Sequence, residues 1–160
     1  METNKLKFTT SNDSTLDWFI NLDSFKLAQK YLKDINSKFK TINEREFAMS
    51  LYRQTKWYQG AMSQVSNFPL KQRAQVTENN YDVIFPTPFI DLINDAALKM
   101  NVPNELILSI MRQESSFIPT ERSWVDAFGL MQLIPERAST LAKKYKINYS
   151  KVDDLYDPAI

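Results

Sequence analysis

Apolar side chains recur at helical spacing along most of the chain, and this pattern restricts the fold more than any other feature. A spacing of three and four residues places such side chains on one face of a helix. No segment alternates cleanly between apolar and polar residues, and no Asn-Gly or Asp-Gly pair marks a two-residue hairpin turn. We therefore predict an all-α protein.

The N-terminal half contains two long helical patterns rich in aromatic residues. The first predicts a helix over about 14–39 with a break near Asp23. The second begins at Asn43, with Glu46 as its capping-box partner. Gly60 either ends this helix or forms a turn before a further short helix. Two antiparallel helices with aromatic stripes are typical of a helical-repeat hairpin.

A polar stretch over residues 69–82 lacks apolar periodicity and indicates a boundary near residue 80. We predict a helical-repeat-like segment over 1–80 and a second domain over 81–160. At 160 residues the chain is long enough for one domain, or for one domain and part of another.

The second half has clearer helix boundaries. Thr87 and Pro88 have the residue types of an N-cap and a first helical position, and Asn101 is a plausible stop. Pro103 opens the next helix, which runs to about residue 116. Pro135 opens another.

Composition excludes several kinds of chemistry. The chain has no histidine and no cysteine, which rules out Ser-His-Asp and Cys-His triads, zinc sites built on those residues, and disulfides. Two glycines cannot form a glycine-rich phosphate loop. The net charge of +1 argues against a dedicated nucleic-acid binder. No apolar run reaches transmembrane length, and no signal peptide is visible.

The helix after Pro103 carries an unusual ionisable group. Glu114 follows Ile107 by seven residues and Ile110 by four, so the spacing predicts a carboxyl at the end of a core stripe. An apolar pocket raises the pKa of a carboxyl, as a general acid near neutral pH requires. The alternative is a helix-end glutamate that reaches solvent or pairs with Arg112 or Arg122.

The segment 127–135 adds two further candidates. Gly129 stands where the backbone must turn closely or take a positive φ before an apolar stretch. Gln132 carries an uncharged amide that suits sugar hydroxyls or acetamido groups. The alternative for Gln132 is an ordinary surface glutamine.

Together these residues resemble the catalytic core of the soluble lytic murein transglycosylase family. The resemblance covers about residues 81–160 and rests on two linked motifs, with a loose likeness of 14–67 to the helical superhelix that precedes this domain. The motifs are Arg112-Gln113-Glu114-Ser115-Ser116-Phe117, followed by Ser123, and then Gly129-Leu130-Met131-Gln132-Leu133-Ile134-Pro135.

The resemblance implies a mainly helical, lysozyme-like SLT catalytic domain. Such enzymes cleave the β-1,4 bond between N-acetylmuramic acid and N-acetylglucosamine in peptidoglycan, using one carboxyl where most glycosidases use two. The glutamate protonates the glycosidic oxygen and then takes the proton of the muramic acid C6 hydroxyl, which closes a 1,6-anhydro ring. It implies glycan strands as partner, no cofactor or metal, and a periplasmic or cell-wall location.

Carried over residue by residue, the resemblance makes Glu114 the catalytic residue. It places Ser123, Met131 and Gln132 at substrate-binding positions. Ser115 follows the acid and supports the helix end, and Gly129, already noted, is part of the second motif.

The chain departs from the family pattern in one loop. The family usually has Gly where Asp126 stands and often Pro where Trp124 stands. Asp tolerates a positive φ better than most residues, so the loop conformation is retained. We expect Asp126 to be a solvated loop residue; the alternative is a second acid that supports hydrolysis, as in goose-type lysozyme.

The family pattern also continues past Asp157-Pro158 into segments that do not occur here, one of which carries a tyrosine that faces the glutamate. We therefore expect a C-terminally truncated fragment that contains the N-terminal half of the SLT domain. The competing hypothesis is an inactive peptidoglycan-binding helical module. The oligomeric state is not predicted.

Overall fold

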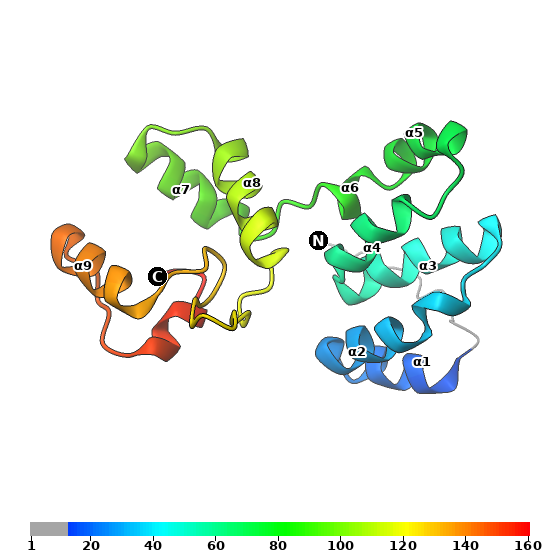
Figure 1. Cartoon of the computed structure of the whole chain (residues 1–160), viewed down its shortest axis with the longest axis horizontal. Coiled ribbons are helices and arrows are strands. Elements are labelled where there is room, and N and C mark those ends of the chain that lie inside the picture. Colours follow the sequence, from blue (N-terminus) through cyan, green and yellow to red (C-terminus); the bar gives the residue numbers. More distant parts are fainter. Residues whose placement is uncertain (1–12) are drawn as a thin grey trace, which may run out of the picture. The chain divides into compact units, whose positions relative to one another are not determined.

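The protein is all-α, as predicted. The computed structural model describes residues 13–160, and within this range it forms nine α-helices, two short 3-10 helices and no β-strand. The chain divides into two compact units, Met1–Pro86 and Thr87–Ile160 (Figure 1).

The described part of the first unit packs its helices in sequence order. Helix α1 packs against α2, α2 against α3, and α3 against α4, while α6 contacts both α3 and α4. Leu16, Leu32, Met49 and Tyr52 form the centre of its core and are fully buried. The helices are α1 (Ser14–Asn21), α2 (Phe25–Ile35), η1 (Asn36–Lys38), α3 (Ile42–Thr55), α4 (Tyr58–Val65), α5 (Leu70–Asn79) and α6 (Tyr81–Ile84).

The predicted break near Asp23 is confirmed, but the predicted start of the next long helix is wrong. Helix α3 begins at Ile42, and Thr41 is its N-cap. Thr41 Oγ1 accepts a hydrogen bond from the Glu44 N–H at 3.2 Å, and Glu44 Oε2 accepts one from the Thr41 N–H at 2.8 Å. The capping box therefore pairs Thr41 with Glu44, in the Thr-x-x-Glu pattern, and not Asn43 with Glu46.

Gly60 neither ends a helix nor forms a turn; it lies inside α4. A Cβ atom at this position would lie 2.4 Å from Cε3 of Trp57, so the missing side chain makes room for the indole ring. Helix α5 forms in the polar stretch that showed no apolar periodicity, and Val76 is its buried residue.

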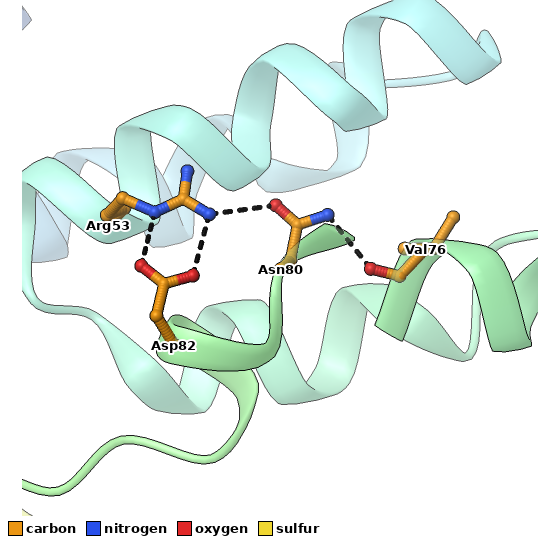
Figure 2. A network of polar contacts seen from close by, with 4 residues as sticks. All are labelled: Arg53, Val76, Asn80 and Asp82. Atoms are coloured by element: carbon orange, nitrogen blue, oxygen red, sulfur yellow. Dashed lines mark hydrogen bonds and ion pairs between the residues drawn. The ribbon is translucent and has the colours of Figure 1, made fainter. Parts of the chain in front are cut away.

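A polar network joins α3 to α5, to α6 and to Asn80 between them (Figure 2). Arg53 donates from Nε and Nη2 to the two carboxylate oxygens of Asp82 at 2.6 and 2.9 Å. The same Nη2 donates to Asn80 Oδ1 at 3.2 Å, and Asn80 Nδ2 donates to the Val76 carbonyl oxygen at 2.9 Å. The hydrogen bonds from Arg53 hold the pKa of Asp82 below its ordinary value.

The second unit contains α7 (Ile90–Met100), α8 (Asn104–Ser115), α9 (Pro135–Tyr145) and η2 (Val152–Tyr156). The predicted stop at Asn101 is confirmed by its left-handed backbone (φ 54°), and Pro135 is the first residue of α9 as predicted. The predicted start of α7 is wrong: Phe89, with φ 60°, precedes its first residue. Pro103 is the N-cap of α8 and not its first residue.

The ion pair in Figure 2 predicts a pH-dependent stability. Because the pKa of Asp82 is lowered in the folded state, its contribution is present above the unfolded-state value of 3.8 and is lost as the pH falls through the folded value. The pair is largely exposed, so Asp82→Asn lowers the free energy of unfolding at about pH 7 by no more than about 1 kcal/mol. Urea unfolding at decreasing pH should show this difference between the two proteins shrinking.

An Arg53→Gln/Asp82→Asn double-mutant cycle provides the control. A difference in the free energy of unfolding that does not change with pH would contradict the assignment.

Candidate active site

Glu114 lies in the last turn of α8 and is exposed. The prediction that its carboxyl continues a buried stripe is therefore wrong, and the alternative of a helix-end glutamate that reaches solvent agrees with the structure. The buried row of this helix runs through Met111 and Ser115, whereas Ile110 is 37% exposed. Since successive helical residues are rotated by about 100°, a row centred on Met111 and Ser115 turns Glu114 out of the core.

Ser115 connects the end of α8 to the loop that carries the second motif. Its side chain is buried, and Oγ lies 3.0 Å from the carbonyl oxygens of both Met111 and Leu130. The helix then ends because Ser116 takes a left-handed conformation (φ 50°), with its N–H donating to Arg112 and Met111 carbonyl oxygens. The predicted support of the helix end by Ser115 thus has a geometric basis.

The second motif forms a tight loop closed by backbone hydrogen bonds. Phe128 and Leu133 exchange N–H to carbonyl bonds, both at 3.0 Å. Gly129 takes the expected positive φ of 75° and donates its N–H to the Glu121 carbonyl oxygen at 2.9 Å. A Cβ atom on Gly129 would lie 1.9 Å from the Leu155 carbonyl oxygen. The glycine therefore allows η2 to approach the loop directly.

Gln132 is half-buried and holds this loop from within. Its Nε2 donates to the Gly129 carbonyl oxygen at 3.0 Å and lies 3.3 Å from that of Glu121. Its backbone is left-handed, with φ 47°. The side-chain amide of Gln132 therefore bonds to the backbone of its own loop. Neither the predicted substrate contact nor the alternative of an ordinary surface glutamine included these bonds.

Ser123 and Asp126 shape the turn that precedes the loop. Ser123 Oγ accepts a hydrogen bond from the Ala127 N–H at 3.0 Å. Asp126 takes a positive φ of 58°, as its replacement of glycine predicted. Its carboxylate is exposed and pairs with Arg122 at 2.6 Å, and this hydrogen bond raises the pKa of the Arg122 guanidinium. The expectation of a solvated loop residue agrees with this position.

An apolar groove of about 430 Å³ lies between α7, α8, the 128–133 loop and the end of the chain. Met131 lines the groove, whereas Glu114, Ser123 and Gln132 do not. Along α7, Ile93 and Ala97 are buried, whereas Leu92 and Met100, which line the groove, are exposed. The groove residues from α7 and α8 are Leu92, Ile93, Ala96, Met100, Leu106, Ile107, Ile110 and Met111, and Phe89 lies just before α7.

Hydrogen bonds join Gln132 to Gly129 and attach Ser115 to the same loop, whereas Ser123 bonds within the preceding turn and the exposed Glu114 lies at the end of α8. Ser115 contacts Leu130 between Gly129 and Met131, Gln132 contacts Gly129, and Ser123 begins the preceding turn. Sequence reasoning missed the backbone carbonyl of Glu121 as a shared acceptor, because a backbone acceptor leaves no signal in the side-chain pattern. Within residues 13–160, no cluster of three or more His, Cys, Asp or Glu could hold a metal ion. No helix in that range could span a membrane.

A lysozyme-like fold with these two motifs is typical of a transglycosylase-type domain. Residues 91–160 match the family described as Transglycosylase SLT domain, so this part of the chain is similar to SLT lytic transglycosylases. The resemblance seen in the motifs is confirmed.

Two curated relatives from Haemophilus influenzae are similar to this part of the chain. "Membrane-bound lytic murein transglycosylase C" (strain PittGG) is 41% identical over 73 residues, which are 44% of this chain and 20% of that protein. "Putative soluble lytic murein transglycosylase" (strain Rd) is 30% identical over 94 residues, which are 57% of this chain and 16% of that protein. The matched region is therefore a fifth or less of each relative.

Two solved structures extend the similarity to most of the chain. An inactive mutant of the lytic transglycosylase Slt from Pseudomonas aeruginosa has a TM-score of 0.71 and 25% identity, and covers 90% of this chain and 22% of that one. The 70-kDa soluble lytic transglycosylase in complex with bulgecin A has a TM-score of 0.69 at 18% identity, covering 99% and 25%. The second likeness supports the fold alone.

The hydrogen bond from Ser115 Oγ to the Leu130 carbonyl oxygen predicts that α8 and the loop stabilise each other against local opening. Ser115→Ala leaves the buried Leu130 carbonyl without this donor and should lower the local opening free energy by about 1–2 kcal/mol. Ser109→Ala is the matched control, because Ser109 lies on the same helix and bonds only to the Glu105 carbonyl, in an exposed position. Native-state hydrogen exchange of residues 111–133 measures both. Equal effects of the two variants would contradict the proposed link.

The close approach at Gly129 predicts a larger effect. Gly129→Ala adds a Cβ against the Leu155 carbonyl at a residue with positive φ and should destabilise the second unit by more than about 1 kcal/mol. Thr120→Ala, an exposed position in the same connection, should change stability by less than about 0.5 kcal/mol. Amide exchange at Phe128 and Leu133 reports the difference. Unchanged protection in Gly129→Ala would show that η2 does not approach the loop in solution.

Proposed function

We propose that this chain is part of a peptidoglycan lytic transglycosylase in which Glu114 acts first as general acid and then as general base. The observation that carries the proposal is the placement of the family's Glu-Ser motif. Glu114 is exposed at the end of α8, and the neighbouring Ser115 fastens that end to the Gly129–Gln132 loop. An exposed carboxyl on a fastened helix end is accessible to a polymeric substrate and held in orientation.

The proposed reaction needs a single carboxyl. Protonated Glu114 donates its proton to the oxygen of the β-1,4 bond between N-acetylmuramic acid and N-acetylglucosamine, and the bond from that oxygen to the muramic acid anomeric carbon breaks. The substrate's acetamido group stabilises the positive charge at that carbon. The C6 hydroxyl oxygen then bonds to the anomeric carbon, and its proton returns to the Glu114 carboxylate. No water is consumed, so the product ends in a 1,6-anhydro ring.

The remaining site residues have supporting roles in this proposal. Met131 and Gln132 lie next to each other in the loop, and Ser123 lies in the preceding turn, where they border the glycan strand. The contacts of Gln132 with Gly129 and Glu121 suggest that it acts on substrate by fixing the loop. Peptidoglycan as substrate implies action in the periplasm or at the cell wall.

Two observations bear on the alternatives. The exposure of Glu114, which does not line the apolar groove, favours as a second candidate a module that binds peptidoglycan without cleaving it. A hydrolase of goose-lysozyme type would need a second acid. Asp126, the residue available for that role, is exposed and paired with Arg122, which supports a role in holding the turn.

Mass spectrometry of soluble products tests the function directly. The protein is incubated with purified peptidoglycan, and the proposed reaction gives fragments lighter by one water molecule than hydrolysed ones. Hydrolysed ends would favour the lysozyme-type reaction, whereas binding without soluble products would favour the module.

Glu114→Gln tests the catalytic assignment. The amide cannot donate and then accept a proton, so product formation should fall by about 100-fold or more. Glu105→Gln removes an exposed carboxyl from the first turn of the same helix and should leave the rate unchanged. Activity that survives in Glu114→Gln would overturn the role of this residue.

A further inference from the structure

Trp124 is almost completely exposed. Its exposed fraction is 95%, the highest among the large apolar side chains of residues 13–160. The other two tryptophans lie in the first unit and are covered to a greater extent, with Trp57 at 8% and Trp18 at 59%. An indole ring that contacts so little of its own chain contributes little to folding.

The turn that presents Trp124 is held at both ends. The Ser123 N–H donates to the Ala127 carbonyl oxygen at 2.9 Å, and the Asp126 N–H donates to the Ser123 carbonyl oxygen at 3.2 Å. The Ala127 N–H donates a hydrogen bond to Ser123 Oγ at 3.0 Å. These bonds span Trp124 and fix the backbone on which the indole stands.

An ion pair and a cation–π contact also stabilise the base of the turn. Arg122 pairs with Asp126 at 2.6 Å, and its guanidinium lies over the Phe128 ring, 5.2 Å from the centroid. Phe128 itself is buried in the core of the second unit. A fixed backbone lowers the entropy that a binding partner must overcome to order the contact.

The chemistry of the tip favours a sugar ring over a membrane. An indole face packs against the C–H face of a pyranose, and neighbouring charged groups can bond to its hydroxyls. Arg122 and Asp126 supply such donors and acceptors. Stable membrane attachment needs a broad apolar face and attraction to anionic lipids, but here Val125 is the only apolar neighbour on the tip and the charges cancel.

We propose that Trp124 is a glycan-binding residue that stacks on a sugar ring of the peptidoglycan strand at the turn before the motif loop. This inference rests on the proposed function and extends it, because tryptophan at this position departs from the family pattern. Trp124 adds a contact to the strand away from the bond that is cleaved. The ring thereby contributes to affinity for the polymer and takes no part in proton transfer.

Co-sedimentation with purified insoluble peptidoglycan tests this role. Trp124→Ala should weaken binding about tenfold, the loss expected for one aromatic stacking contact, and Trp124→Phe should retain most of it. Trp18→Ala is the matched control, because Trp18 is also an exposed tryptophan but lies in the first unit. Circular dichroism and the Tm should be unchanged in Trp124→Ala, since the ring is exposed.

Each outcome distinguishes this inference from the proposed function. Unchanged binding by Trp124→Ala, with the unmodified chain bound, overturns the stacking role and leaves the transglycosylase proposal standing. No binding by the folded, unmodified chain overturns both recognition of peptidoglycan by this chain and the stacking role. Association with phosphatidylglycerol vesicles that is lost in Trp124→Ala, without an effect on peptidoglycan binding, would assign the tip to a membrane instead.

Discussion

The candidate site depends on the close approach of the Gly129 backbone to the Leu155 carbonyl. No side chain fits between them, and Gly129 also donates its N–H to Glu121. The loop is thereby held from η2 on one side and from the preceding connection on the other, while Ser115 attaches it to α8 through Leu130. The acceptors in these contacts are backbone carbonyls, so the site geometry follows the path of the main chain.

Local signals predicted much of the fold. Helix-ending Asn101 and helix-opening Pro135 behaved as their backbone preferences require, and the all-α class followed from apolar periodicity. Helix α5 was missed because it has one buried apolar residue, Val76. Its start is stabilised by its own Arg73, which donates to the Phe68 and Ser66 carbonyl oxygens, and Asn80 after its last residue accepts a tertiary hydrogen bond from Arg53. Such tertiary contacts leave no periodic pattern in the sequence.

The site residues show the same limit. The positive φ values of Gly129 and Asp126 could be predicted, because they depend on each residue's own backbone preference. The exposure of Glu114 remained one of two alternatives, because Ile110 and Met111 both belong to the apolar face and the spacing does not determine which of them points to the core. Gln132 was assigned to substrate because its carbonyl partners are invisible in the sequence.

In the second unit, Glu114 and Trp124, both proposed to act on a glycan, lie outside the apolar groove. The groove between α7 and α8 is lined by side chains such as Leu92 and Met100, which offer no hydrogen bonds, and burying a sugar hydroxyl there without a partner would cost about 1–3 kcal/mol. A glycan therefore suits the exposed polar edge with Glu114 and the turn with Trp124 better than it suits the groove. Since neither residue lines the groove, the proposed recognition of a glycan depends on the hydrogen-bonded loop and turn and does not use the apolar surface.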